Sequence, residues 1–139
     1  MIGRIIQIIG SIVDVEFKKK YIPKIFNALF IIEKKIYLEV QQQIGNNIVR
    51  TIALGDTNGL QKNFLVLDTK NPILTPVGEK TLGRILNVLG EPIDNFGEIK
   101  FKKKVPIHKK SPKFSDQIYN NNILETGIKV IDLLCPFLK

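Results

Sequence analysis

Short apolar segments separated by turn-forming residues run along the first half of the chain, and they restrict its fold more than any other feature. In Ser11–Phe17 the apolar Val13, Val15 and Phe17 alternate with polar residues, which is the period of a strand with one face in a core. Similar apolar segments are Met1–Gly10, Ala28–Ile32, Ile36–Gln43, Ile48–Leu54 and Phe64–Leu67. Short strands at such close spacing predict a small closed barrel or a sandwich, and closure of a barrel removes exposed strand edges.

Turn signals divide these segments. Gly45-Asn46-Asn47 tolerates positive φ and predicts a hairpin turn, and Gly55–Gly59 predicts a second turn. The close prolines of Asn71-Pro72 and Thr75-Pro76 predict a connection where the strand pattern changes.

The second half of the chain is less regular. Thr81–Leu89 is followed by a predicted turn at Gly90-Glu91-Pro92. Lys100–Phe114 is basic and contains prolines, so we expect an extended, exposed segment, and Ser115–Asn122 is polar. Thr126–Leu134 is predicted to be a helix that ends before Pro136.

The predicted helix has features at both ends and along one face. Thr126 is suited to cap its N-terminus, and Glu125 just before it would favour the helix dipole. Ile128, Ile131 and Leu134 stand three residues apart on one apolar face. Asp132 is interpreted as a surface or interface residue.

Composition excludes several classes of protein. No apolar run approaches the roughly 20 residues of a membrane-spanning helix, and we interpret the apolar start as a strand and not as a signal peptide. The single Cys135 cannot form an internal disulfide and is expected to be a small buried hydrophobe. His108 has no Cys or second His beside it, so a metal role is not expected. No metal ligand is assigned.

The chain is basic, with a net charge of +8 and 18 lysines against 3 arginines. Lysine clusters lie at residues 18–20, 102–104 and 109–110, and Phe101 and Phe114 border the second and third clusters. A basic β-barrel with aromatic side chains is typical of proteins that bind single-stranded nucleic acid. The alternative is compositional drift, since isoleucine, lysine and asparagine share AT-rich codons.

Two apparent motifs are interpreted as structural. Gly78–Ile85 matches half of a phosphate-binding loop, but Arg84 stands where that loop has Lys and Ile85 where it has the hydroxyl residue. A turn followed by a strand is therefore predicted. Asp14 and Glu16 share one strand face, and we expect that face to be solvated because nothing suggests a pocket that would separate their pKa values.

Four stretches in family order, covering almost the whole chain, resemble the catalytic beta subunit of F-type ATP synthases. They are GRIIQIIGSIVDVEF (3–17), LEVQQQIGNNIVRTIALG (38–55), PVGEKTLGRILNVLGEPID (76–94) and LETGIKVIDLLCPF (124–137). The stretches Leu38–Gln43 and Thr126–Asp132 look like the beta subunit and not the related alpha subunit.

The resemblance implies a mainly β fold, with a six-stranded N-terminal β-barrel in residues 1–74. Residues 75–139 would be the truncated start of an α/β nucleotide-binding domain. The implied function is ATP synthesis from ADP and phosphate, driven by a proton gradient. The implied partners are alpha subunits in an alternating ring and the central rotor stalk. The implied location is peripheral, on the cytoplasmic (or matrix or stroma) side of an energy-coupling membrane.

We expect this chain to be inactive alone, because it ends before the family's phosphate-binding loop. No catalytic, cofactor-binding or metal-binding residue of the family is carried over to a position here, and MgATP or MgADP is the cofactor of the full-length family. Lys100–Lys113 also departs from the family, in which this stretch is more acidic. Lys100–Lys139 is expected to be less stable than the barrel.

Two alternatives stay open at this point. One is a stand-alone basic β-barrel that binds single-stranded nucleic acid, with affinity that falls steeply with salt. The other is a competitor that caps an alpha subunit and blocks ring closure.

Overall fold

The computed structural model describes residues 1–18, 21–101, 103–116 and 122–138. The chain divides into two compact units, Met1–Lys109 and Lys110–Lys139. The predicted domain boundary after residue 74, with residues 75–139 as the start of a second domain, stays a prediction.

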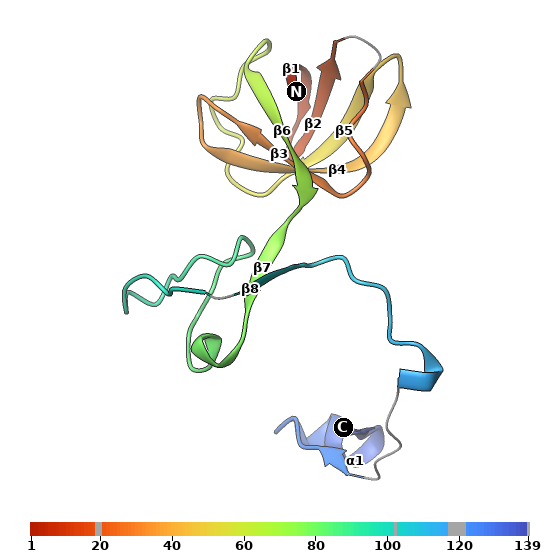
Figure 1. The fold of residues 1–139 in the computed structure, drawn as a ribbon, viewed down its shortest axis with the longest axis vertical. Coiled ribbons are helices and arrows are strands. Elements are labelled where there is room, and N and C mark those ends of the chain that lie inside the picture. The colour runs from red at the N-terminus through yellow and green to blue at the C-terminus, as the bar shows by residue number, and fades with distance from the viewer. Residues whose placement is uncertain (19–20, 102, 117–121, 139) are drawn as a thin grey trace. The chain divides into compact units, whose positions relative to one another are not determined.

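The first unit is built on a closed barrel of six antiparallel strands, in the order β1-β2-β5-β4-β3-β6 (Figure 1). Pairing of β1 with β6 closes it. The strands are β1 (Ile2–Ile9), β2 (Ile12–Phe17), β3 (Asn27–Ile31), β4 (Ile36–Gly45), β5 (Ile48–Ala53) and β6 (Leu65–Pro72). The predicted six-stranded, mainly β fold is confirmed.

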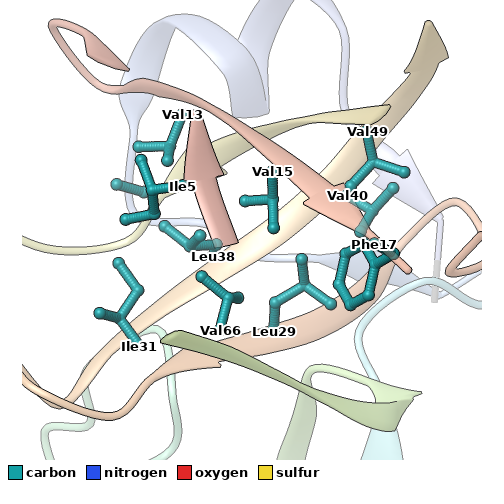
Figure 2. Close-up of a cluster of buried hydrophobic side chains, with 11 residues drawn as sticks. Ile5, Val13, Val15, Phe17, Leu29, Ile31, Leu38, Val40, Val49 and Val66 are labelled. Carbon is teal, nitrogen blue, oxygen red and sulfur yellow. The ribbon is translucent and has the colours of Figure 1, made fainter. Parts of the chain in front are cut away.

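Alternating apolar side chains from every strand fill the barrel. Figure 2 shows them converging in one cluster, with Phe17 at one end. The buried members are Ile5, Val13, Val15, Phe17, Leu29, Ile31, Leu38, Val40, Val49, Ala53 and Val66. Fully burying each large apolar side chain contributes about 1.5–3 kcal/mol, so this cluster is the main source of barrel stability.

Local backbone geometry allows the strands to form a closed barrel. Gly45, Asn46 and Asn47 have φ of 107°, 49° and 61° and form the predicted turn between β4 and β5. At Gly3, an added Cβ would lie 2.8 Å from the carbonyl oxygen of Glu16, so glycine is needed where β1 approaches β2. A register shift at Ile5/Gln7 bends β1.

The predicted connection around Pro72 and Pro76 is instead strand. Pro72 ends β6, and Pro76 lies in β7 (Leu74–Val77), which pairs antiparallel with β8 (Lys103–Pro106). Pro76 is tolerated because β7 has a partner strand on one side only, and Pro72 is tolerated because it lies at the end of β6, beyond the residues that pair with β1. The expected extended segment from Lys100 is confirmed in its β8 part.

The stretch between β7 and β8 contains little regular structure. Glu79–Thr81 forms one turn of 3-10 helix, which confirms the predicted turn. The strand predicted after it is wrong, since Leu86 makes only an isolated bridge to Pro92. Gly90, with φ of 76°, forms the predicted turn between them.

The second unit contains a 3-10 turn (Phe114–Asp116) and a short sheet in which β9 (Ile123–Leu124) pairs with β10 (Phe137–Leu138). Its helix α1 (Lys129–Leu134) begins three residues later than predicted and ends before Pro136 as predicted. Part of the polar stretch 115–122 lies outside the described residues.

The helix begins late because Gly127 has φ of 78°, which is left-handed backbone. The predicted capping role of Thr126 is wrong, because the capping position is Ile128. The Thr126 hydroxyl accepts from the amide of Ile128 at 3.2 Å and donates to Asp132 at 2.6 Å. No described residue of α1 is buried, and Leu133 is 82% exposed. Cys135, predicted to be buried, is also exposed, because the short helix leaves it uncovered.

Candidate interaction surface

Outward-facing apolar residues line up across four barrel strands. Ile2 of β1 is opposite Leu67 of β6, which is opposite Phe30 of β3, which is opposite Tyr37 of β4. Ile2 is 53% exposed, and the rings of Phe30 and Tyr37 lie 4.9 Å apart. We call these four residues the first apolar row.

A second apolar row crosses β1, β2 and β5. Ile9 of β1 is opposite Ile12 of β2, which is opposite Ile52 of β5. Ile9 is 54% exposed. Positions that face water on an antiparallel sheet are ordinarily polar, and contiguous exposed apolar surface marks a site of interaction with another molecule. The two rows therefore make the barrel wall a candidate interaction surface.

The strands β2 and β5, which carry Ile12 and Ile52, also hold a charged pair that the sequence did not reveal. Asp14 and Arg50 are opposite each other on β2 and β5, with two hydrogen bonds of 2.9 Å. Asp14 is 4% exposed, so the expectation of a solvated face is wrong for Asp14, which Arg50 covers. Glu16 is exposed as expected. The hydrogen bond to Asp14 raises the pKa of Arg50.

Asp14 is thus paired with a permanent cation and fixed in place. The Asp14–Arg50 pair stabilises the contact between β2 and β5.

His108 also has partners that the sequence did not reveal. Its Nε2 lies 2.7 Å from Oε1 of Glu39 on β4, and its ring stacks on Phe26 at 4.0 Å. Glu39 is 69 positions away in the chain, and no local pattern could have connected them.

The half-matched phosphate-loop stretch makes internal contacts. Thr81 Oγ1 donates to the carbonyl oxygen of Gly78 at 2.7 Å. Arg84 donates to both carboxylate oxygens of Asp94 and to the carbonyl oxygen of Gly97. The Arg84 hydrogen bond holds the pKa of Asp94 well below its usual range, with help from the amides of Phe96 and Ile85. The hydrogen bonds of Arg84 to Asp94 and Gly97 therefore stabilise this loop.

The carboxylates near α1 do not have the roles that the sequence predicted for them. Asp132 accepts hydrogen bonds from the hydroxyl and amide of Thr126 and from the amide of Gly127. The hydroxyl contact is the main reason that the pKa of Asp132 is lowered. Glu125 is exposed, four positions before the helix begins, so Asp132 and not Glu125 organises this end.

The described lysines of the clusters are exposed and lie outside the barrel strands. They are Lys18, Lys103, Lys104, Lys109 and Lys110. Lys19, Lys20 and Lys102 lie outside the described residues. Phe101 is half-buried and Phe114 is exposed. Within the six barrel strands, all of which are described, Lys70 is the one lysine.

A hollow of about 280 Å³ lies where the barrel meets β7. Its lining includes Tyr37, Asn71, Leu89, Glu91 and Lys104. Among the residues that the structure describes, no group of three or more His, Cys, Asp or Glu side chains could hold a metal ion.

Comparison with known proteins finds a family model that matches the barrel. Residues 5–70 match the family model of the ATP synthase alpha/beta family, beta-barrel domain. The barrel is similar to the domain that this family model describes. The match covers β1 from Ile5 onward and nearly all of β6, so it coincides with the closed six-stranded sheet.

The domain that matches is one of ATP synthase alpha and beta subunits. In the described portion of the chain, no helix has the length and apolar character needed to cross a membrane.

Proposed function

We propose that this chain supplies the barrel of a beta-type subunit in an F-type ATP synthase, where it alternates with alpha-type subunits in a ring. The observation that carries the proposal is the family match over residues 5–70. The beta-type assignment rests on Leu38–Gln43 and Thr126–Asp132, which resemble the beta subunit. The two apolar rows offer the surface that such neighbours would cover.

The proposed assembly makes ATP from ADP and phosphate, using a proton gradient that turns a central rotor stalk. The barrel would act as scaffold, and the assembly would be peripheral on the side of the membrane where ATP is made. Within residues 78–85, Arg84 pairs with Asp94 and Ile85 has no hydroxyl, so we propose no nucleotide site there. Tight binding of MgATP by the chain alone, measured by calorimetric titration, would contradict this.

Co-purification with an alpha-type subunit tests the assembly. In the variant Leu67→Glu, a charge enters the middle of the first apolar row, and we expect recovery of the complex to fall about tenfold or more. The matched control is Gln7→Glu, which adds the same charge at an exposed position of β1 outside the rows.

The outcomes of this co-purification experiment distinguish the assembly proposal from the nucleic-acid alternative. Equal recovery of both variants would show that the first apolar row is not the interface. Capture of RNA in place of the alpha-type subunit, with affinity that falls steeply as salt rises, would favour the nucleic-acid alternative. The placement of the described lysine clusters outside the barrel strands supports the assembly proposal over that alternative.

A further inference from the structure

A chemically reactive pair of residues lies in the loop between β5 and β6. Of all the asparagines in the sequence, Asn58 is the one that glycine follows. The backbone nitrogen after an asparagine reaches the side-chain amide carbon most easily when it belongs to glycine, because glycine has no Cβ to obstruct the approach. Asn58 and Gly59 are both exposed, so water has access to the pair.

A tight turn holds Asn58 and Gly59. The amide of Leu60 donates to the carbonyl oxygen of Thr57 at 3.1 Å, and Gly59 has φ of 74°, which is left-handed backbone that glycine adopts readily. Asp56 accepts hydrogen bonds from the amide of Asn58 at 2.9 Å and from its Nδ2 at 3.2 Å. Among the hydrogen bonds of the described residues, none uses the Gly59 amide. The Gly59 nitrogen is therefore available as a nucleophile.

A lysine side chain approaches the same turn. A Cβ added at Gly59 would lie 3.0 Å from Nζ of Lys34 and 3.6 Å from its Cε, and no other atom outside the neighbouring residues would lie within 4 Å. Lys34 belongs to the loop between β3 and β4, so the fold brings two loops together here. The ammonium group is close enough to attract negative charge that forms on the Gly59 nitrogen or on the carbonyl group that it attacks.

We propose that Asn58 is a site of spontaneous deamidation in the folded barrel, with the Gly59 nitrogen as nucleophile and the Lys34 ammonium stabilising the charge that forms. The Gly59 nitrogen loses its proton to solvent and bonds to Cγ of Asn58, and Nδ2 takes up a proton and departs as ammonia. Water then opens the resulting five-membered succinimide at either of its carbonyl carbons, which gives aspartate or isoaspartate. The reaction consumes water and releases ammonia, and it requires no oxidant or reductant.

The product changes the loop in two ways. A carboxylate at position 58 has no Nδ2 to donate and places a second negative charge beside Asp56. Isoaspartate also adds one carbon to the backbone inside the turn that Leu60 closes. Because Leu60 packs against the barrel core, we expect the modification to loosen this loop from the core.

Peptide mass spectrometry of the folded chain after incubation at neutral pH tests the proposal. Trypsin releases Thr51–Lys62, which contains Asn58 and no other asparagine. We expect the mass of this peptide to rise by about 1 Da, and an isoaspartate-specific methyltransferase to label it. The internal control is Ile36–Arg50, in which the exposed Asn46 lies in a turn but is followed by asparagine, and we expect it to stay unmodified.

The unfolded chain shows whether the fold permits the reaction. In urea the turn is lost and Asn58 is free to react. An unchanged Thr51–Lys62 peptide from the folded chain, under conditions in which the chain in urea is modified at Asn58, would overturn the proposal.

The variant Lys34→Met tests the part of the proposal that concerns the ammonium group. We expect deamidation of Asn58 in the folded chain to slow about twofold to fivefold, which is the effect of one exposed charge on another nearby. The matched control is Lys24→Met, which removes an exposed lysine that does not approach Gly59. In urea, Lys34→Met should react at the rate of the wild type. Equal rates for the two variants in the folded state would overturn the role proposed for Lys34.

Discussion

At the scale of single residues, Asp68 is a carboxylate in the barrel that depends on hydrogen-bond donors from other residues. It is buried at the end of the core, where an ionised carboxylate requires several donors. Tyr21 donates its hydroxyl to Oδ2, while Asn27 Nδ2 and the Lys70 amide donate to Oδ1 at 3.2 Å and 2.8 Å. Together these contacts join the loop before β3 to β6.

Removal of the Tyr21 hydroxyl should destabilise the barrel. In Tyr21→Phe, Asp68 keeps its two nitrogen donors and loses one charge-assisted hydrogen bond, so the free energy of unfolding should fall by about 1.5 kcal/mol. Urea unfolding at neutral pH measures this difference. A loss of less than a few tenths of a kcal/mol would show that the contact is not a net source of stability.

The same contact gives a pH dependence with a definite sign. The hydrogen bond to Asp68, with burial, raises the pKa of Tyr21 to about 12 from its ordinary value of 10.0. A raised folded-state pKa means that this contribution is fully present below about pH 10 and is lost as pH rises through about 12. The stability difference between wild type and Tyr21→Phe should therefore shrink over that interval.

At the scale of elements, the spacing of apolar residues predicted where strands lie, but it did not predict the extension of β6 or the start of α1. The alternation in Ser11–Phe17 predicted β2, because burial of every second side chain leaves a direct trace in the sequence. The extension of β6 to Pro72 left no such trace, since proline ordinarily signals a break. The start of α1 was misplaced because Thr126 has the composition of a cap, while the backbone of Gly127 decides the geometry.

The β4–β5 hairpin offers a test at this scale. Asn47 has φ of 61°, and a β-branched residue tolerates left-handed backbone poorly. Asn47→Val should reduce the free energy of unfolding by about 1–2 kcal/mol. Asn47→Gly, the matched control, should be neutral or slightly stabilising because glycine adopts this conformation readily. Equal effects of the two changes in urea unfolding would contradict a conformational cause.

At the scale of the whole molecule, the closed barrel could be predicted and the long-range contacts on its wall could not. Short strands at close spacing left a closed barrel and a sandwich as alternatives, and the resemblance to the ATP synthase beta subunit favoured the barrel. The contacts of Glu39 with His108 and of Asp14 with Arg50 join residues 69 and 36 positions apart. The contact of Asp14 with Arg50 depends on the register of β2 against β5, and His108 lies in the segment after β8, so the sequence pattern predicts neither contact.

Limited proteolysis tests which parts of the chain unfold together. The barrel buries eleven apolar residues in one cluster, while no described residue of α1 is buried. Because cleavage follows local opening, and opening is easiest where few apolar contacts are made, we expect residues 100–139 to be cut first and the barrel to survive.

Mass spectrometry of the resistant fragment then locates the boundary. An end near residue 74 would support the predicted division there. An end near Lys109 would show that the β7–β8 sheet and the contact of His108 with Glu39 unfold together with the barrel. Loss of the barrel at the same rate as the C-terminal segment would contradict both.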